Sequence, residues 1–275
     1  MNLYSGYLAA AGAVALCLTA LFLLWRMRVV DVRSPRILLY HMISDPRPGA
    51  RFNGMRVAPA LFERQLRWLD DHGWTSFTMS ELIARGAQLP AKAYAITFDD
   101  GYADNFEQAL PLLQRHKVKA TLYLVVDRFH RDWSAQRNPR HDDGELMQEP
   151  KLSDAQVRAL LDSGLFELGA HTLTHPDLTK LDSYEAAEEI GESRHNLEAT
   201  FSVPVRSFAY PFGLYDARHL LHLMQSGYTS AVTTDDGVEP PAAWHPLRLR
   251  RIKISGRDGL GAFRRALRTG RRGWF

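Results

Sequence analysis

Short apolar runs alternate with segments of helical periodicity along most of the chain. The apolar runs are rich in branched and aromatic residues and end in polar turns, which predicts strands at 37–44, 93–100, 120–126, 165–171, 205–211, 228–234 and 247–255. Between them, apolar residues recur at helical spacing, which predicts helices at 59–73, 105–117, 153–164, 183–201 and 216–227. This alternation is typical of one α/β domain, either a barrel or a doubly wound sheet, and periodicity alone does not choose between them.

One connection between these elements is much longer than the others. Residues 127–153 are mainly polar and contain no clear helix or strand pattern. Long connections of this kind in compact domains are commonly lids or binding loops. We therefore expect this loop to shape a functional site.

The first thirty residues differ in composition from the rest of the chain. Residues 7–25 carry no charge and have about the length that crosses a hydrocarbon core as a helix, and Arg26 and Arg28 end the run. The alternative is a cleaved signal peptide, but no basic residue precedes the run and no A-x-A-like site follows it. Residues 1–30 are therefore predicted to be a membrane anchor with one transmembrane helix.

Basic residues bear on the orientation of this anchor. Arg26, Arg28, Arg33 and Arg36 follow the apolar run and none precedes it, so the positive-inside rule taken alone favours a cytoplasmic position for the rest of the chain. Arginines also gather in the C-terminal segment 256–275, predicted as a basic tail. That tail is expected either to lie on anionic lipid or to be a solvated end.

The overall composition excludes several classes of protein. Hydrophobic residues make up 45% of the chain and aromatic residues 11%, which excludes a disordered chain and supplies one large core. The net charge of +3 is too small to indicate nucleic-acid binding. Cys17 is the single cysteine, so the chain has no internal disulfide.

Several polar residues stand where predicted strands end. Asp99 and Asp100 end one strand, and His171 ends another, with His175 four residues later. The carboxyl ends of parallel strands share one edge of the sheet, where active sites of α/β folds lie. Two histidines and a carboxylate are a common ligand set for a catalytic divalent metal. Either pair alone is a weak signal, since paired acids often sit in turns, but their joint occurrence at strand ends indicates a site.

Three sequence motifs, in order, resemble those of the polysaccharide deacetylases, also known as carbohydrate esterase family 4 or NodB-homology enzymes. They are TFDDGY at 97–102, HTLTH at 171–175 and RSFAYPFG at 206–213. The resemblance covers residues 36–255 and implies a distorted (β/α) barrel of about seven strands. The stretches LLYHMI and FAYPFG are most similar to the branch that deacetylates poly-N-acetylglucosamine and similar exopolysaccharides.

The resemblance implies a role for each motif residue. Asp100, His171 and His175 would hold a divalent metal, zinc in the first place, with nickel, cobalt or iron as alternatives; such an ion polarises a carbonyl and acidifies bound water. Asp99 would be the general base. Arg206 would orient Asp99 through a charge-assisted pair.

Other residues are expected at the substrate. The backbone N–H of Tyr210 would stabilise the oxyanion, and His41 and Pro211 would contact the substrate. The fourth and fifth motifs of the family have no clear counterpart in the sequence, so the proton donor for the leaving amine is unassigned. His41 is the first candidate for this role and His245, before Pro246, the second.

Together these features predict a metal-dependent hydrolase that removes N-acetyl groups from sugars of a polysaccharide. One alternative is a deacylase of a lipid-linked sugar at the cytoplasmic membrane face, and another is a polysaccharide-binding module that has lost turnover. The family resemblance favours a catalytic domain outside the bacterial inner membrane, whereas the arginines after the anchor favour the inside.

Overall fold

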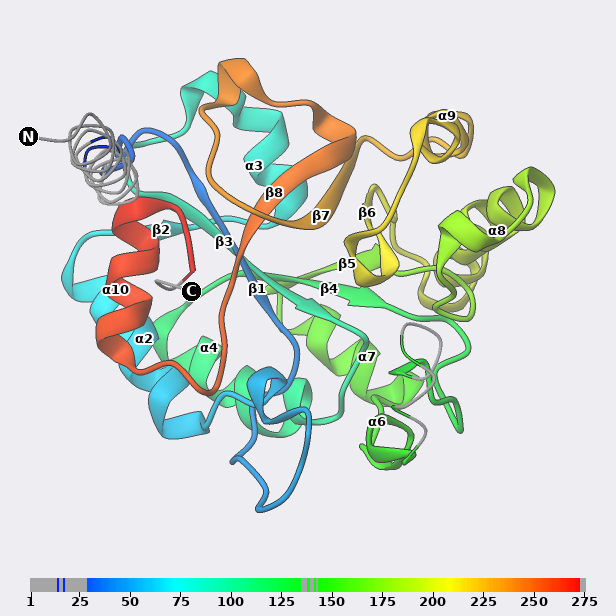
Figure 1. The fold of residues 1–275 in the computed structure, drawn as a ribbon, viewed down its shortest axis with the longest axis horizontal. Helices are drawn as coiled ribbons and strands as arrows, with labels where there is room; N and C mark the ends of the chain where they lie inside the picture. Colours follow the sequence, from blue (N-terminus) through cyan, green and yellow to red (C-terminus); the bar gives the residue numbers. More distant parts are fainter. Residues whose placement is uncertain are drawn as a thin grey trace, which may run out of the picture.

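Parallel strands form a closed barrel at the centre of the protein (Figure 1). The computed structural model describes residues 29–134, 138, 141 and 143–272, together with residues 14 and 17. The strands of this described part are β1 (Arg36–Tyr40), β2 (Thr75–Ser76), β3 (Ala93–Asp99), β4 (Ala120–Leu124), β5 (Phe166–Ala170), β6 (Ser207–Ala209), β7 (Ser230–Asp236) and β8 (Leu249–Lys253). The ring closes because β1 pairs with both β3 and β8, while β2 pairs only with the start of β3. The predicted barrel of about seven strands is confirmed.

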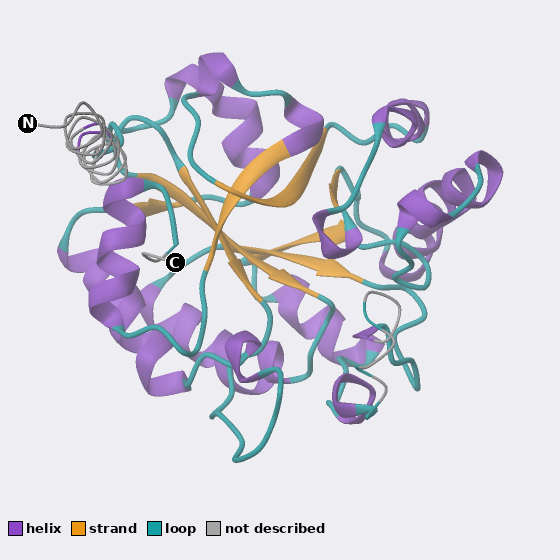
Figure 2. Cartoon of the chain, in the orientation of Figure 1, coloured by secondary structure: helices purple, strands orange, loops and turns teal. Residues whose placement is uncertain are grey.

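Helices surround this barrel (Figure 2). In the described residues they are α2 (Pro59–Asp71), α3 (Met79–Arg85), α4 (Leu110–His116), α6 (Glu145–Gln148), α7 (Asp154–Asp162), α8 (Ser183–Phe201), α9 (Ala217–Gln225) and α10 (Leu260–Thr269). Local sequence sets several boundaries. Ser153 caps α7 and Asp182 caps α8, each accepting a hydrogen bond from backbone N–H groups of the first turn.

Both faces of the barrel strands are buried, which explains their nearly continuous apolar sequences. One cluster fills the interior and includes Ile37, Tyr123, Val232 and Leu249. A second, larger cluster lies between the strands and the helices, and Ile252 of β8 belongs to it. Neighbouring residues of one strand therefore enter different apolar layers.

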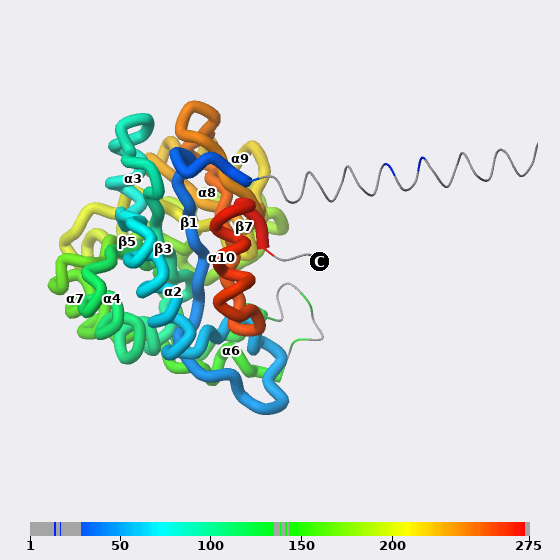
Figure 3. The backbone as a smooth tube through the Cα atoms, turned by 90° about the vertical axis from the view of Figure 1, so that its left-hand side faces the viewer, coloured from blue at the N-terminus to red at the C-terminus, as the bar shows by residue number. Residues whose placement is uncertain are grey.

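The C-terminal segment predicted as a tail contains a packed helix. Helix α10 lies beside α2 (Figure 3). It buries Phe263, Ala266 and Leu267 in the outer cluster, while none of its arginines is buried. Residues 260–269 thus contribute to the core of the domain and are not a solvated tail.

The predicted membrane-spanning segment, residues 7–25, lies outside the described residues except for positions 14 and 17. In the part of the chain that the structure describes, no helix has both the length and the apolar character needed to span a bilayer.

Candidate active site

The two adjacent aspartates diverge at the end of β3. Asp99 is the last residue of the strand, and Asp100 and Gly101 follow with φ of 78° and 80°. A Cβ at position 101 would lie 2.4 Å from Leu124 Cδ1, so both the backbone conformation and the contact require glycine. This left-handed turn gives the two carboxylates different partners.

Asp100 faces the two motif histidines. Its Oδ1 lies 3.3 Å from His171 Nε2 and 3.5 Å from His175 Nε2, and all three side chains are buried. His171 Nδ1 lies 2.7 Å from the carbonyl oxygen of Ala209. A carbonyl only accepts, so Nδ1 carries the proton in the neutral ring and Nε2 presents a lone pair to Asp100.

This arrangement fits a divalent metal ion. Two tetrahedral ligands that each lie about 2.1 Å from an ion are about 3.4 Å apart, which matches the two distances from Asp100. Burial and the neighbouring His171 lower the pKa of His175 to about 3, so its imidazole is neutral, as metal binding requires. For His171, burial lowers the pKa but Asp100 and Asp99 outweigh it, and the pKa is raised. The site thus favours a positive charge between these three side chains, which form a group able to hold a metal.

Asp99 is held by an arginine from the other end of the sequence. Arg251 of β8 donates from Nη1 to Asp99 Oδ1 and from Nη2 to Oδ2, each at 2.7 Å. Further bonds from Arg251 to Thr97 Oγ1 and to the Thr233 carbonyl fix the guanidinium. Burial raises the pKa of Asp99, but the Arg251 guanidinium outweighs burial and holds that pKa below its usual range. Asp99 is therefore ionised at neutral pH and able to accept a proton.

The prediction that Arg206 orients Asp99 is wrong. Arg206 is exposed and directly precedes β6, so it lies at the amino end of that strand. Asp99 lies at the carboxyl end of β3, the opposite end of a parallel barrel. Arg251 takes the place that the motif had suggested for Arg206.

Three other predicted positions differ in the structure. The backbone N–H of Tyr210 donates to the Val232 carbonyl at 3.2 Å, so it is already used in the contact between β6 and β7 and is not a free oxyanion donor. Tyr210 still lines the cavity described below, although its side chain packs in the outer apolar cluster, whereas Pro211 is buried in a short 3₁₀ turn and does not line it. His245 is exposed before the amino end of β8, which excludes it as a proton donor at the site.

A cavity of about 760 Å³ opens over these groups. Asp99, Asp100, His171 and His175 lie in its wall, as does His41, which is placed as predicted. Trp133, from the loop 127–153, and Phe212, from the third motif, also line it, whereas Lys253 and Arg257 are lining residues that the sequence prediction missed. No motif marks Lys253 or Arg257, although Lys253 stands two residues after Arg251 and so shares its side of β8.

The long loop 127–153 supplies part of this wall, as predicted from its length. Trp133 is buried, and its ring centroid lies 4.9 Å from that of His175. On the other side, Phe212 meets His175 edge to face at 4.7 Å. Aromatic rings therefore enclose His175 and exclude water from it on two sides.

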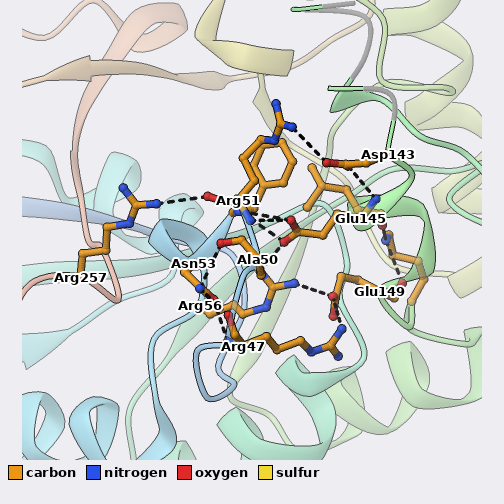
Figure 4. A network of polar contacts seen from close by, with 12 residues as sticks. Arg47, Ala50, Arg51, Asn53, Arg56, Asp143, Glu145, Glu149 and Arg257 are labelled. Atoms are coloured by element: carbon orange, nitrogen blue, oxygen red, sulfur yellow. Dashed lines mark hydrogen bonds and ion pairs between the residues drawn. The ribbon is translucent and has the colours of Figure 1, made fainter. Parts of the chain in front are cut away.

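A buried ion-pair network attaches this loop to the segment after β1 (Figure 4). The Arg56 guanidinium is fully buried and donates to Glu145 Oε1 at 2.9 Å and to Glu149 Oε1 at 2.5 Å. Arg47 also pairs with Glu149, at 2.6 Å, but its side chain is 57% exposed. Two loops that are distant in sequence are thus joined into one wall of the cavity.

Comparison with known proteins identifies a family and several relatives that are similar to this chain. The family model described as polysaccharide deacetylase matches residues 86–231, more than half of the chain. The Bacillus subtilis protein YxkH is 27% identical over 204 residues, which cover 73% of this chain and 64% of that protein. The poly-beta-1,6-N-acetyl-D-glucosamine N-deacetylase of Staphylococcus epidermidis is 25% identical over 204 residues, 70% of this chain and 66% of that enzyme.

Among solved structures, the Streptococcus pyogenes deacetylase PplD in complex with acetate is similar to this chain. Its TM-score is 0.67 at 26% identity, and the match covers 83% of this chain and 94% of PplD. The match with the two curated relatives thus spans slightly less than two thirds of their length, whereas it spans nearly all of PplD.

Proposed function

The chain belongs to the polysaccharide deacetylase family, and from that premise we propose that it is a metal-dependent hydrolase that removes N-acetyl groups from a polysaccharide and releases acetate. The S. epidermidis relative, named for poly-beta-1,6-N-acetyl-D-glucosamine, and the acetate complex of PplD support this substrate class and product. The proposed polymer is an exopolysaccharide or cell-envelope glycan rich in N-acetylglucosamine.

The observation that carries the proposal is the different pairing of two adjacent carboxylates. Asp100 faces two imidazole nitrogens and Asp99 faces a guanidinium, and both line one cavity. A metal-dependent hydrolase of an unactivated amide uses a metal ion as electrophilic centre and, beside it, a base that is ionised at neutral pH. Asp100 and the two histidines can hold the electrophilic centre, and Asp99 is the base.

The chain's own residues then have distinct tasks. Asp100, His171 and His175 would hold the divalent ion, for which we propose zinc, and the ion when bound would polarise the acetamide carbonyl and acidify water. Asp99 would accept the proton of the attacking water. Arg251 keeps Asp99 ionised and fixed in direction, and the aromatic wall around His175 excludes bulk solvent, which strengthens these charges.

Two single substitutions are expected to separate the two tasks. Asp100→Asn is expected to lose bound metal and, with it, acetate release from N-acetylglucosamine oligomers. Asp99→Asn is expected to keep its metal and to lose activity by about 10²- to 10⁴-fold, the range for a general base. Metal content by elemental analysis and acetate release by an enzymatic assay measure both.

Equal metal content in the two variants would contradict the division between the carboxylates. A metal-loaded unaltered chain that releases acetate from no N-acetylated sugar would contradict the proposed function itself.

We also propose that residues 7–25 anchor the barrel in the bacterial inner membrane, with the catalytic domain outside the cytoplasm. The apolar run and the outward export of exopolysaccharide support this. Alkaline phosphatase fused to the C-terminus is expected to be active in cells. Activity of a cytoplasmic reporter instead would reverse the orientation and favour a lipid-linked sugar at the inner face as substrate.

A further inference from the structure

The last strand of the barrel brings two cationic side chains toward the catalytic cavity. In β8, Leu249 belongs to the cluster inside the barrel, and Arg251 reaches Asp99 there. Alternate residues of a strand share one side, so Lys253 lies on this inner side too, about 7 Å nearer the mouth than Arg251. Lys253 pairs in register with Leu39 of β1 and lines the same cavity as both aspartates.

The Lys253 ammonium makes no polar contact that would hold it in a purely structural role. No hydrogen bond or ion pair to it occurs within the described part of the chain. Arg251, by contrast, uses its donors on Asp99, Thr97 and Thr233. A partly buried ammonium without a partner loses solvation and gains no bond in return, which is costly for a residue that serves only the fold.

Charged groups on several elements act on Lys253. Burial, Arg272 after α10 and Arg251 lower its pKa, while Asp99 and Asp100 raise it less, and the resulting pKa is below the usual range. Lys253 is thereby a stronger acid than an ordinary lysine. His41, after β1, is the neighbouring titratable group; burial lowers its pKa, so at neutral pH it lacks the second ring proton that an imidazolium would donate.

We propose that Lys253 is a catalytic residue that donates a proton to the leaving amine. The inference rests on the proposed amide hydrolysis. Asp99 takes one proton from water while the water oxygen bonds to the acyl carbon. When the C–N bond breaks, its electron pair stays on nitrogen, and Lys253 protonates that nitrogen. The products are the free amine and acetic acid, which loses its proton to solvent, and Lys253 regains a proton from Asp99 through solvent.

The test compares two substrates whose leaving groups need different help. An N-acetylglucosamine oligomer must release an amine, which requires a proton, whereas 4-nitrophenyl acetate releases 4-nitrophenolate, which leaves without one. Lys253→Met is expected to lower kcat on the oligomer by about 10²-fold or more, with little change in KM, and to lower ester hydrolysis by less than about threefold. It is also expected to remove the alkaline limb of the kcat/KM profile on the oligomer.

A matched variant separates the proton from the charge. Lys253→Arg keeps the positive charge but does not give up a proton near neutral pH, so it is expected to be as slow as Lys253→Met on the oligomer. Recovery in Lys253→Arg, an equal loss on both substrates, or unchanged turnover of the oligomer in Lys253→Met would each overturn the assignment. Thermal unfolding and metal content show that each variant is folded. Absence of acetate release by the unaltered chain would instead overturn the proposed function, and the inference with it.

Discussion

Replacing Arg251 with methionine is expected to lower deacetylation at neutral pH by about 100-fold or more, because the proposed general base, Asp99, loses the group that keeps it ionised. Both Asp99 oxygens bond to this guanidinium at 2.7 Å. Without it, burial is opposed only by the smaller effects of His171 and His41, and the pKa of Asp99 is expected to rise. Breaking a buried ion pair also costs about 3–5 kcal/mol of unfolding free energy. Initial rates and urea denaturation measure the two effects.

Arg206 provides the matched control for this experiment. Its side chain is exposed at the amino end of β6, so Arg206→Met is expected to change stability by no more than about 0.5 kcal/mol and to leave turnover unchanged. Combining Arg251→Met with Asp99→Asn should restore much of the lost stability but none of the activity, since no buried charge is then unpaired. An Arg206 variant as inactive as the Arg251 variant would refute the pairing seen in the structure.

Replacing Arg56 with methionine is expected to destabilise the protein by about 3–5 kcal/mol, because the buried Glu149 would keep only the largely exposed Arg47 as an opposite charge. Arg47→Met removes an ion pair to the same Glu149 oxygen, but Arg47 is largely exposed. Its loss is expected to cost no more than about 1 kcal/mol. Denaturant unfolding of the two variants under one condition gives the comparison.

The Arg56 effect should also reach the cavity. The network attaches the loop that carries Trp133 to the segment after β1. We therefore expect a raised KM for polymer in Arg56→Met, with metal content unchanged. Equal destabilisation by the Arg47 and Arg56 substitutions would show that burial of Arg56 has no energetic consequence.

The proposed metal ligands and the proposed base were predictable as one cluster because they follow a general rule of parallel α/β folds. Polar residues at the carboxyl ends of β3 and β5 meet at one edge, and motif order identified Asp99, Asp100, His171 and His175. The prediction for Arg206 did not follow this rule, because Arg206 precedes β6 and so lies at the amino end of that strand. The motif contains an arginine, but the motif alone does not show toward which end of the barrel that arginine side chain lies.

Arg251 was missed for a different physical reason. Its strand contains apolar residues on both sides, Leu249 inside the barrel and Ile252 beneath the helices. Alternation in such a strand does not reveal which side is the interior. The sequence therefore did not show which of the basic residues of β8 face the inside of the barrel. The Arg56 network was equally hidden, since it joins two polar loops whose pairing depends on the folded barrel.

The position of Arg251 in the last strand has a consequence for the order in which the protein becomes active. Its contact with Asp99 spans 152 residues of sequence, and such distant contacts form late because a long loop must close first. A chain made from its N-terminus contains both aspartates and both histidines long before β8 exists. Barrel closure would therefore also complete the proposed active site, and a nascent or C-terminally truncated chain is expected to contain the proposed metal ligands without the Arg251 partner of Asp99.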